Sequence, residues 1–118
     1  MLRFILWSAD LHQGMSRRFP LSDGAEGFAL RDSSDAVRAY LNRCPHRAQP
    51  VDLGDGKLFT KDGSLECQAH GALFDPANGA CRGGPCFGDS LTRLSIEERA
   101  GRIYLDESEP HELIDDSG

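Results

Sequence analysis

Two short motifs in this chain combine cysteine with histidine. Cys44 and His46 are separated by one residue, Cys67 and His70 by two, and twenty residues lie between the motifs. Thiolate sulfur suits iron–sulfur clusters and zinc, and neutral imidazole suits iron and zinc. Two thiolates on one iron and two imidazoles on the other can hold a [2Fe–2S] cluster. The residue types therefore predict a metal centre with these four side chains as ligands.

The spacing helps to choose between the two metals. Structural zinc sites usually pair their ligands across two to four residues, often with one ligand type in each pair. Here each motif supplies one Cys and one His, and only Pro45 separates the first pair. Pro45 and Gly71 also supply turn chemistry for the two loops. The pattern favours the iron–sulfur cluster, and a structural zinc module is the alternative.

The residues around the motifs resemble the Rieske-type ferredoxins and the cluster domains of Rieske proteins. The resemblance covers roughly residues 37–94 and rests on these stretches: Tyr40-Leu41-Asn42-Arg43-Cys44-Pro45-His46, Cys67-Gln68-Ala69-His70-Gly71-Ala72-Leu73-Phe74-Asp75, Asn78-Gly79 and Gly83-Gly84-Pro85. It implies three stacked antiparallel sheets with a cluster-binding subdomain, at about residues 42–87.

The same resemblance implies a role for each ligand. Cys44 and Cys67 would bind an inner, buried iron. His46 and His70 would bind an outer iron, with their free ring edges near solvent as the shortest route for electrons. A third loop rich in Gly and Pro covers the cluster in that family, and Gly83-Gly84-Pro85 matches it here.

Composition and turn signals predict an all-β protein. A chain of 118 residues is one domain. Its thirteen glycines point to tight turns, and no window has convincing helical periodicity. Many short strands joined by turns indicate a sandwich or barrel, with a hairpin entering the first motif. The strands expected are residues 2–7, 25–31, 36–41, 72–74, 80–82, 91–96 and 102–105.

The negative charge of the chain is concentrated near residue 118. The formal charge is −6, and residues 1–105 hold thirteen acidic and thirteen basic side chains. We therefore expect a neutral domain, residues 1–105, and an acidic tail, residues 106–118. A solvated tail is the first interpretation, and a steering arm for a basic partner is the alternative. The tail acids are Asp106, Glu107, Glu109, Glu112, Asp115 and Asp116.

The sequence lacks the features of a nucleic-acid-binding protein, a secreted protein or a membrane protein. No basic patch stands out, so nucleic acid is not an expected partner. The apolar run at residues 2–7 is too short for a signal segment, and no window approaches the roughly 20 apolar residues of a membrane helix. We expect a cytoplasmic protein without a membrane anchor. Four cysteines in such a chain favour metal or redox chemistry over disulfides.

Six further residues could do chemistry but have plainer interpretations. Cys81 and Cys86 flank the expected cover loop and are interpreted as half-buried thiols, with a disulfide or a second metal site as the alternative. His12 and His111 are expected on the surface. Arg43, with Arg47, flanks the first ligand pair as a solvated charge or as a contact for an acidic partner.

The resemblance implies a low-potential one-electron carrier rather than an enzyme. It would pass electrons from a flavin reductase to an oxygenase or another redox enzyme. Rieske oxygenases add a mononuclear iron domain, and only 48 residues follow His70. The alternative is an electron-relay subunit of a larger complex, like the small subunit of nitrite reductases. A redox sensor is a further alternative.

The expected low potential rests on groups that are missing near the ligands. High-potential respiratory members carry an extra disulfide between the ligand loops, a Ser hydroxyl and a Tyr hydroxyl. The matching positions here are Gln49 and Ala69, then Ala72, then Phe74. Hydrogen bonds to the sulfurs raise the potential. Without those donors, the chain is expected near the negative end of the Rieske range.

Overall fold

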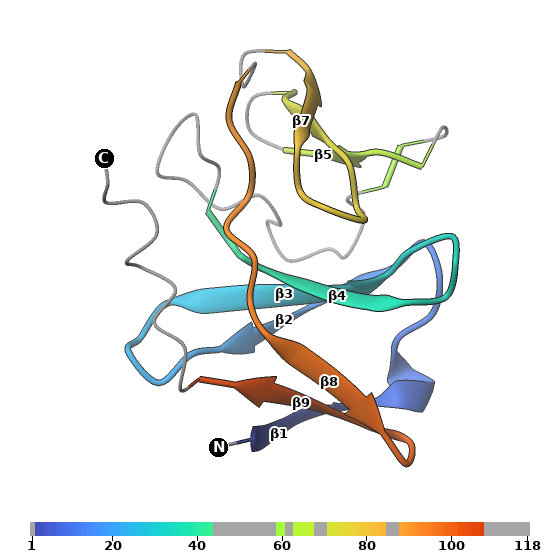
Figure 1. The fold of residues 1–118 in the computed structure, drawn as a ribbon, viewed down its shortest axis with the longest axis vertical. Helices are drawn as coiled ribbons and strands as arrows, with labels where there is room; N and C mark the ends of the chain where they lie inside the picture. The colour runs from blue at the N-terminus through green and yellow to red at the C-terminus, as the bar shows by residue number, and fades with distance from the viewer. Residues whose placement is uncertain (1, 44–58, 61–62, 68–70, 85–87, 108–118) are drawn as a thin grey trace.

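The described residues of the chain fold into three small antiparallel sheets (Figure 1). The computed structural model describes residues 2–43, 59–60, 63–67, 71–84 and 88–107. Among these residues the only helix is a short 3-10 turn, η1 (Ser8–Asp10). The all-β prediction is therefore confirmed. The strands are β1 (Leu2–Trp7), β2 (Ser16–Pro20), β3 (Glu26–Arg31), β4 (Val37–Leu41), β5 (Leu65–Glu66), β6 (Leu73–Phe74), β7 (Cys81–Gly83), β8 (Ile96–Arg99) and β9 (Arg102–Asp106).

Two of the sheets form what we call the body of the molecule. Their strand orders are β1-β9-β8 and β2-β3-β4. The third sheet, β5-β6-β7, is called the small sheet and lies at the opposite end of the molecule from β1 and β9 (Figure 1). In the described residues, no helix is long and apolar enough to cross a membrane.

The last hairpin differs from its prediction in its first strand. The sequence indicated a strand at residues 91–96, but β8 begins at Ile96. Residues 91–95 instead cross from the small sheet to the body along β4: Leu41 N donates to Thr92 O, and Leu94 N donates to Ala39 O. Ala100 and Gly101 form the turn that joins β8 to β9. Both residues have positive φ, 52° and 78°, as a two-residue type I′ hairpin requires.

Two strands were not predicted. β2 contains Arg17, Arg18 and Pro20, which interrupt any apolar alternation. It forms because Ser16 and Phe19 face the interior while the arginines face solvent. β5 has only two residues, too few for a periodic signal.

In the part of the chain that the structure describes, the buried side chains form two apolar clusters. One lies within the body and includes Leu11, Phe19, Leu94, Ile103 and Leu105. The other joins the body to the small sheet, because it combines Phe28 and Tyr40 from β3 and β4 with Leu65, Cys67 and Phe74. The small sheet therefore packs on the body through a shared core.

A buried arginine ties the two body sheets together. The Arg31 guanidinium donates to Leu11 O at 2.8 Å, to Asp35 O at 3.1 Å and to Glu98 Oε2 at 2.7 Å. Arg31 lies on β3 and Glu98 on β8, so this ion pair crosses between the sheets. The hydrogen bond from Arg31 lowers the pKa of Glu98. A buried charge of this kind is tolerated because each polar contact is satisfied.

The folded body extends past residue 105. β9 ends at Asp106. The Glu107 carboxylate then accepts from Ser22 N at 2.8 Å, from Ser22 Oγ at 2.7 Å and from Arg3 Nε at 2.9 Å. These hydrogen bonds, led by that from the Ser22 backbone, lower the pKa of Glu107 to about 2. The first two acids of the expected tail thus belong to the folded part, and residues 108–118 lie outside the described residues.

Candidate metal centre

The second motif begins at the end of a very short hairpin. β5 and β6 pair antiparallel, with Leu65 opposite Phe74 and Glu66 opposite Leu73. Cys67 follows β5 directly. Its N–H donates to Ala72 O at 2.8 Å, and its carbonyl accepts from Gly71 N at 2.9 Å. The loop that begins at Cys67 is therefore closed at its base by two backbone hydrogen bonds.

Gly71 makes this closure possible. Its φ is +76°, a left-handed conformation that glycine adopts without steric cost. The Cys67 side chain points into the core shared with the body and is fully buried. Its thiol is in no disulfide. A buried thiol beside a loop closed by hydrogen bonds suits a metal ligand, because the hydrophobic surroundings of a metal site control its access to solvent.

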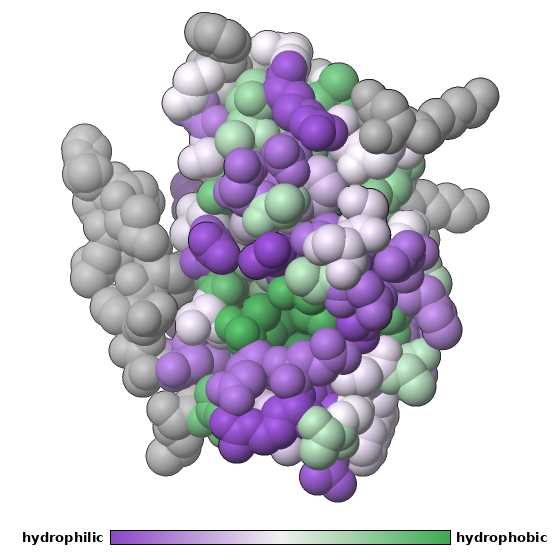
Figure 2. Space-filling view, turned by 45° about the vertical axis from the view of Figure 1, so that its right-hand side comes forward, coloured by the Kyte–Doolittle hydropathy of each residue, from purple (hydrophilic) through white to green (hydrophobic). Residues whose placement is uncertain are grey.

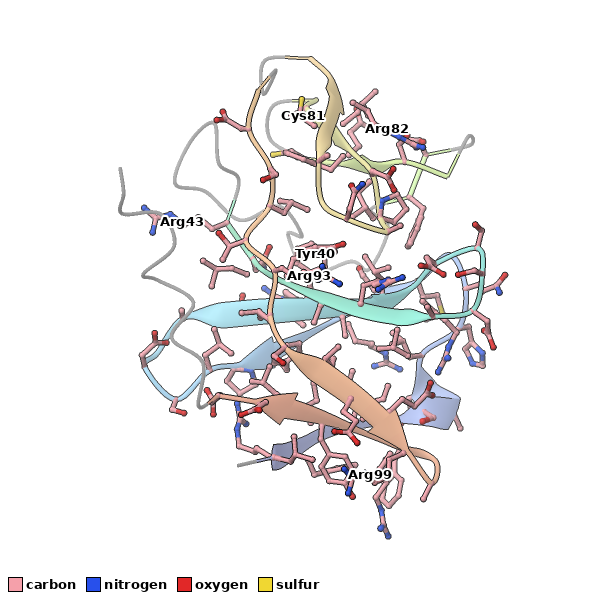
Figure 3. All side chains as sticks on the ribbon, in the orientation of Figure 1. Tyr40, Arg43, Cys81, Arg82, Arg93 and Arg99 are labelled. Carbon is pink, nitrogen blue, oxygen red and sulfur yellow. The ribbon has the colours of Figure 1, made fainter. Side chains whose placement is uncertain are left out.

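The first motif follows β4. Asn42 N donates to Glu26 O at 2.8 Å, and Arg43 N donates to Leu41 O at 2.8 Å. These bonds fix the chain as far as Arg43, whose side chain is exposed (Figure 3). β4 therefore delivers the residue before Cys44 in a defined position.

A third segment packs against the second motif. Gly84 has a φ of +84°, and a Cβ at this position would lie 3.1 Å from both Ala72 Cα and Gly71 O. Only glycine lets the two backbones approach this closely. The sequence predicted Gly83-Gly84-Pro85 as a cover loop, and its described part, Gly83 and Gly84, lies against the base of the second ligand loop.

Tyr40 fixes the small sheet to the body. It is fully buried on β4, and its hydroxyl donates to Pro76 O at 2.8 Å (Figure 3). Burial raises the pKa of Tyr40 to about 12. Gly79, in the turn between β6 and β7, packs against the ring, because a Cβ there would meet Tyr40 Cε1 at 2.9 Å. The resemblance included both residues, but their contact was not predicted.

The structure describes one of the four predicted ligands. Cys67 is described, whereas Cys44, His46 and His70 lie outside the described residues. Within the described ranges alone, no group of three or more potential ligands comes together. The described residues do fit a cluster: a buried thiol that is in no disulfide, a loop closed behind it, and a glycine contact that leaves no side chain between the second and third loops.

The remaining candidates have mixed outcomes. His12 is exposed, as predicted, and His111 lies outside the described residues. Cys81 is half-buried on β7, as predicted, but it is disulfide-bonded, so the free-thiol interpretation is wrong for this residue. Cys86 and Arg47 lie outside the described residues.

Comparison with known proteins gives the same family as the sequence motifs. A family model described as the Rieske [2Fe–2S] domain matches residues 4–96. The oxidoreductase NdmD of Pseudomonas putida is 30% identical over 105 residues, which is 80% of this chain and 17% of that protein. The oxygenase component of chloroacetanilide N-alkylformylase from Rhizorhabdus wittichii is 35% identical over 87 residues, 74% of this chain and 23% of that protein. The chain thus spans less than a quarter of the length of these curated relatives.

Solved structures share the fold. The ferredoxin of carbazole 1,9a-dioxygenase from Nocardioides aromaticivorans IC177 superposes with a TM-score of 0.73 at 25% identity, covering 89% of this chain and 96% of that one. Dicamba monooxygenase superposes with a TM-score of 0.74 at 22% identity, covering 93% of this chain but only 33% of that one. The three-sheet architecture therefore occurs both as nearly a whole ferredoxin chain and as one part of a larger oxygenase.

Proposed function

Because the chain belongs to the Rieske [2Fe–2S] domain family and so takes one [2Fe–2S] cluster, we propose that it is a one-electron carrier. Its partners are proteins: a reductase that supplies the electron, with a flavin reductase as the first candidate, and an oxygenase or other redox enzyme that accepts it. The chain itself carries no catalytic residue in this proposal, and it works in the cytoplasm. The ferredoxin similarity over most of both chains supports this reading.

Four side chains would hold the cluster. Cys44 and Cys67 supply thiolates to one iron, and His46 and His70 supply neutral imidazoles to the other. When bound, the cluster supplies one-electron redox chemistry. The chain's own part is to bind it, to exclude water from the sulfur side and to set its potential.

The observation that carries the proposal is the setting of Cys67. Its thiol is fully buried and is in no disulfide, and the loop after it is closed by hydrogen bonds from Cys67 N to Ala72 O and from Gly71 N to Cys67 O. Burial in apolar surroundings disfavours a thiolate. A bound metal reverses that preference, because a coordinating thiol is deprotonated. The hydrophobic wall on one side of Cys67 would then keep solvent from the cluster.

A low potential is part of the proposal. Ala72 and Phe74 occupy the positions where a hydroxyl would donate to the cluster or a ligand sulfur, and both are fully buried and carry no donor. Rieske centres span about −150 to +300 mV, and hydrogen bonds to sulfur raise the potential within that range. This chain is expected near the negative end, which suits electron uptake from a nicotinamide-linked reductase.

The carrier role is tested with a stoichiometric transfer experiment. The purified chain is reduced anaerobically, freed of excess reductant and mixed with oxidised cytochrome c, a protein that accepts one electron. We expect one cytochrome reduced per chain, and no transfer from Cys67→Ala. Two electrons per chain, or equal transfer from Cys67→Ala, would contradict the proposal.

Substitutions at the two donor positions test the potential. Ala72→Ser and Phe74→Tyr should each raise the midpoint potential, because each adds a hydroxyl that donates to sulfur and stabilises the reduced cluster. Leu73→Met changes the residue between them without adding a donor and serves as the control. Unchanged potentials in both hydroxyl variants would remove this explanation of a low potential.

A second candidate is a relay domain within a larger oxidoreductase. The curated relatives favour it, because this chain matches only 17% and 23% of their lengths. A partner that stays bound through gel filtration of the protein from its native source would support a fixed relay. Elution of the chain alone would support a free shuttle.

A further inference from the structure

The two body sheets separate along one line and leave a groove. It is lined by Val37, Arg38 and Ala39 of β4 and by residues 93–96, and its volume is about 350 Å³. At one end the sheets are joined by the hydrogen bond from Leu94 N to Ala39 O. At the other end they are joined again by the ion pair between Arg31 and Glu98. The groove is therefore a fixed feature of the fold.

The floor of the groove is apolar and its rim is basic. Val37, Ala39, Leu94 and Ile96 supply the apolar lining. Figure 2 shows a hollow of hydrophobic atoms across the middle of this face, bordered by hydrophilic residues, at the height where β4 and β8 diverge in Figure 1.

Two arginines line the groove, one from each side: Arg38 from β4 and Arg93 from the crossing segment. Figure 3 labels Arg93. Arg38 pairs with Asp32 at 3.2 Å, but exposed Arg93 has no ion pair with any described residue. An acidic occupant with an apolar centre would match this surface.

Backbone groups also face the groove. On β4, Ala39 O and Leu41 N point toward residues 92–94. Backbone groups of every second residue in a strand face the same side, so the N–H and C=O of Val37 also point away from β3 and toward the groove. On β8, Ser95 O accepts from Asp106 N, so the neighbouring residue Ile96 faces away from β9. Such unpaired edges bind an extended polypeptide by main-chain hydrogen bonds. They favour a peptide segment over a small molecule.

We propose that the groove between β4 and β8 binds residues 108–118 of the same chain. This segment has four acids and no basic Lys or Arg, and the adjacent pair Leu113-Ile114 lies between Glu112 and Asp115. The acids complement Arg38 and Arg93, and the apolar pair complements the floor.

The last strand ends beside one residue of the groove, two residues before the segment starts. β9 ends at Asp106, whose N–H donates to the carbonyl of the groove residue Ser95 at 3.0 Å. Beyond Glu107, the eleven residues 108–118 extend at most about 3.3–3.6 Å each. That is ample to cross a molecule whose longest extent is 38 Å. A short tether also gives the segment a roughly millimolar effective concentration, so a weak site is filled.

A competing groove fits the segment less well. Phe4, Trp7, Arg102 and Tyr104 line a smaller apolar groove of about 250 Å³ on the outer face of the β1-β9-β8 sheet. It has one arginine, and the Arg102 guanidinium lies 5.3 Å from the centre of the Trp7 ring. Unlike the groove between β4 and β8, it is lined among the described residues by no second cation and by no residue of β4.

The test compares the full cluster-loaded chain with a version that ends at Glu107. This version keeps the hydrogen bonds of Glu107 with Ser22 and Arg3. Backbone amide NMR signals of Val37, Arg38, Ser95 and Ile96 are followed in both. We expect these signals to shift on truncation. Synthetic peptide 108–118 added to the truncated protein should restore them, and high salt should weaken the peptide because exposed charges are screened.

Matched variants identify the contact. Arg93→Gln in the truncated protein should weaken peptide binding by about two- to fivefold, the range for exposed ion pairs. Arg99→Gln makes the same charge change on β8, outside the groove-lining residues, and should leave affinity unchanged (Figure 3). Equal weakening by both variants would reduce the effect to general charge and overturn the proposal.

Other outcomes also overturn it. Unchanged groove signals on truncation would show that the segment does not bind there. Shifts confined to Phe4, Trp7 and Tyr104 would place it in the aromatic groove instead. Groove shifts in the full chain that grow with protein concentration would mean that a second copy supplies the segment.

Discussion

The body and the small sheet differ in how much structure holds each in place. Body strands run for four to six residues, whereas those of the small sheet have two or three. The body has its own apolar cluster and the crossing ion pair of Arg31. The small sheet relies on the core that it shares with β3 and β4 and on single contacts at Tyr40 and Gly84.

This difference shows how the fold divides its tasks. Burial of apolar side chains stabilises the body without help from a cofactor. Two-residue strands cannot supply that much burial, so the end that would hold the metal depends on ligation for part of its stability, as in other small metal-binding units. Each prediction below should affect one region more than the other.

The largest effect is expected at the buried ligand. Cys67→Ala removes one thiolate from the proposed cluster, so iron content should fall from two atoms per chain to near zero. Hydrogen exchange should quicken in β5, β6 and β7 while β1, β9 and β3 keep their protection. Cys81→Ser, also on the small sheet, should keep both irons. Full iron content in Cys67→Ala would mean that Cys67 is not a ligand.

The second effect belongs to the body. Arg31→Met should lower the free energy of unfolding by about 3 kcal/mol, because it leaves Glu98 and the carbonyls of Leu11 and Asp35 without their donor. Urea unfolding measures the change, and the visible spectrum of the folded protein should not alter. Arg17→Met, on the exposed side of β2, should change stability by less than about 0.5 kcal/mol. Equal losses in both variants would contradict the role of the buried ion pair.

The third effect returns to the small sheet. Gly84→Ala and Gly88→Ala both place a Cβ at positive φ, +84° and +92°. Of the two, only the Cβ at Gly84 meets backbone atoms at 3.1 Å, whereas no described atom lies within 4 Å of a Cβ at Gly88. Gly84→Ala should therefore cost about 1–3 kcal/mol more than Gly88→Ala. It should also speed loss of iron to a chelator. Equal stability and equal rates of iron loss in the two variants would contradict the close packing of Gly84 on the loop that follows Cys67.

The smallest effect is pH-dependent and lies at the edge of the body. The pKa of Glu107 is lowered to about 2, so its contribution to stability is present above its ordinary value near 4.5 and is lost as pH falls toward 2. Glu107→Gln should reduce stability at pH 7 by up to about 1 kcal/mol, as expected for a partly exposed pair. Melting curves of the two proteins should converge between pH 4.5 and 2. A difference in stability between the two proteins that stays constant down to pH 2 would contradict the role of the hydrogen bonds from Ser22 and Arg3 to Glu107.

Local signals in the sequence predicted much of the body. The hairpin of β3 and β4 and the turn at Ala100-Gly101 follow from strand and turn chemistry within a few residues. The start of β8 was misplaced because Leu91 and Leu94 are buried by packing along β4, which no local pattern reveals. β2 was missed because its arginines face solvent.

The metal centre was predictable in its ligand types but not in its supports. Cys67 stood out by its spacing from His70. The hydrogen bond from Tyr40 to Pro76 joins residues 36 apart in sequence, and the approach of Gly84 to Ala72 depends on how two loops meet. Such contacts come from tertiary packing, so a single sequence carries no direct sign of them. The positions of Cys44, His46 and His70 remain predictions.

A potentiometric titration followed by EPR tests the central claim most directly. The claim is that this chain carries one electron at low potential on a cluster held by two cysteines and two histidines. It predicts no signal in the oxidised protein, one unpaired spin per chain after reduction, and a midpoint potential at pH 7 between about −150 mV and zero. Absence of a signal after reduction, or a midpoint well above zero, would contradict the account.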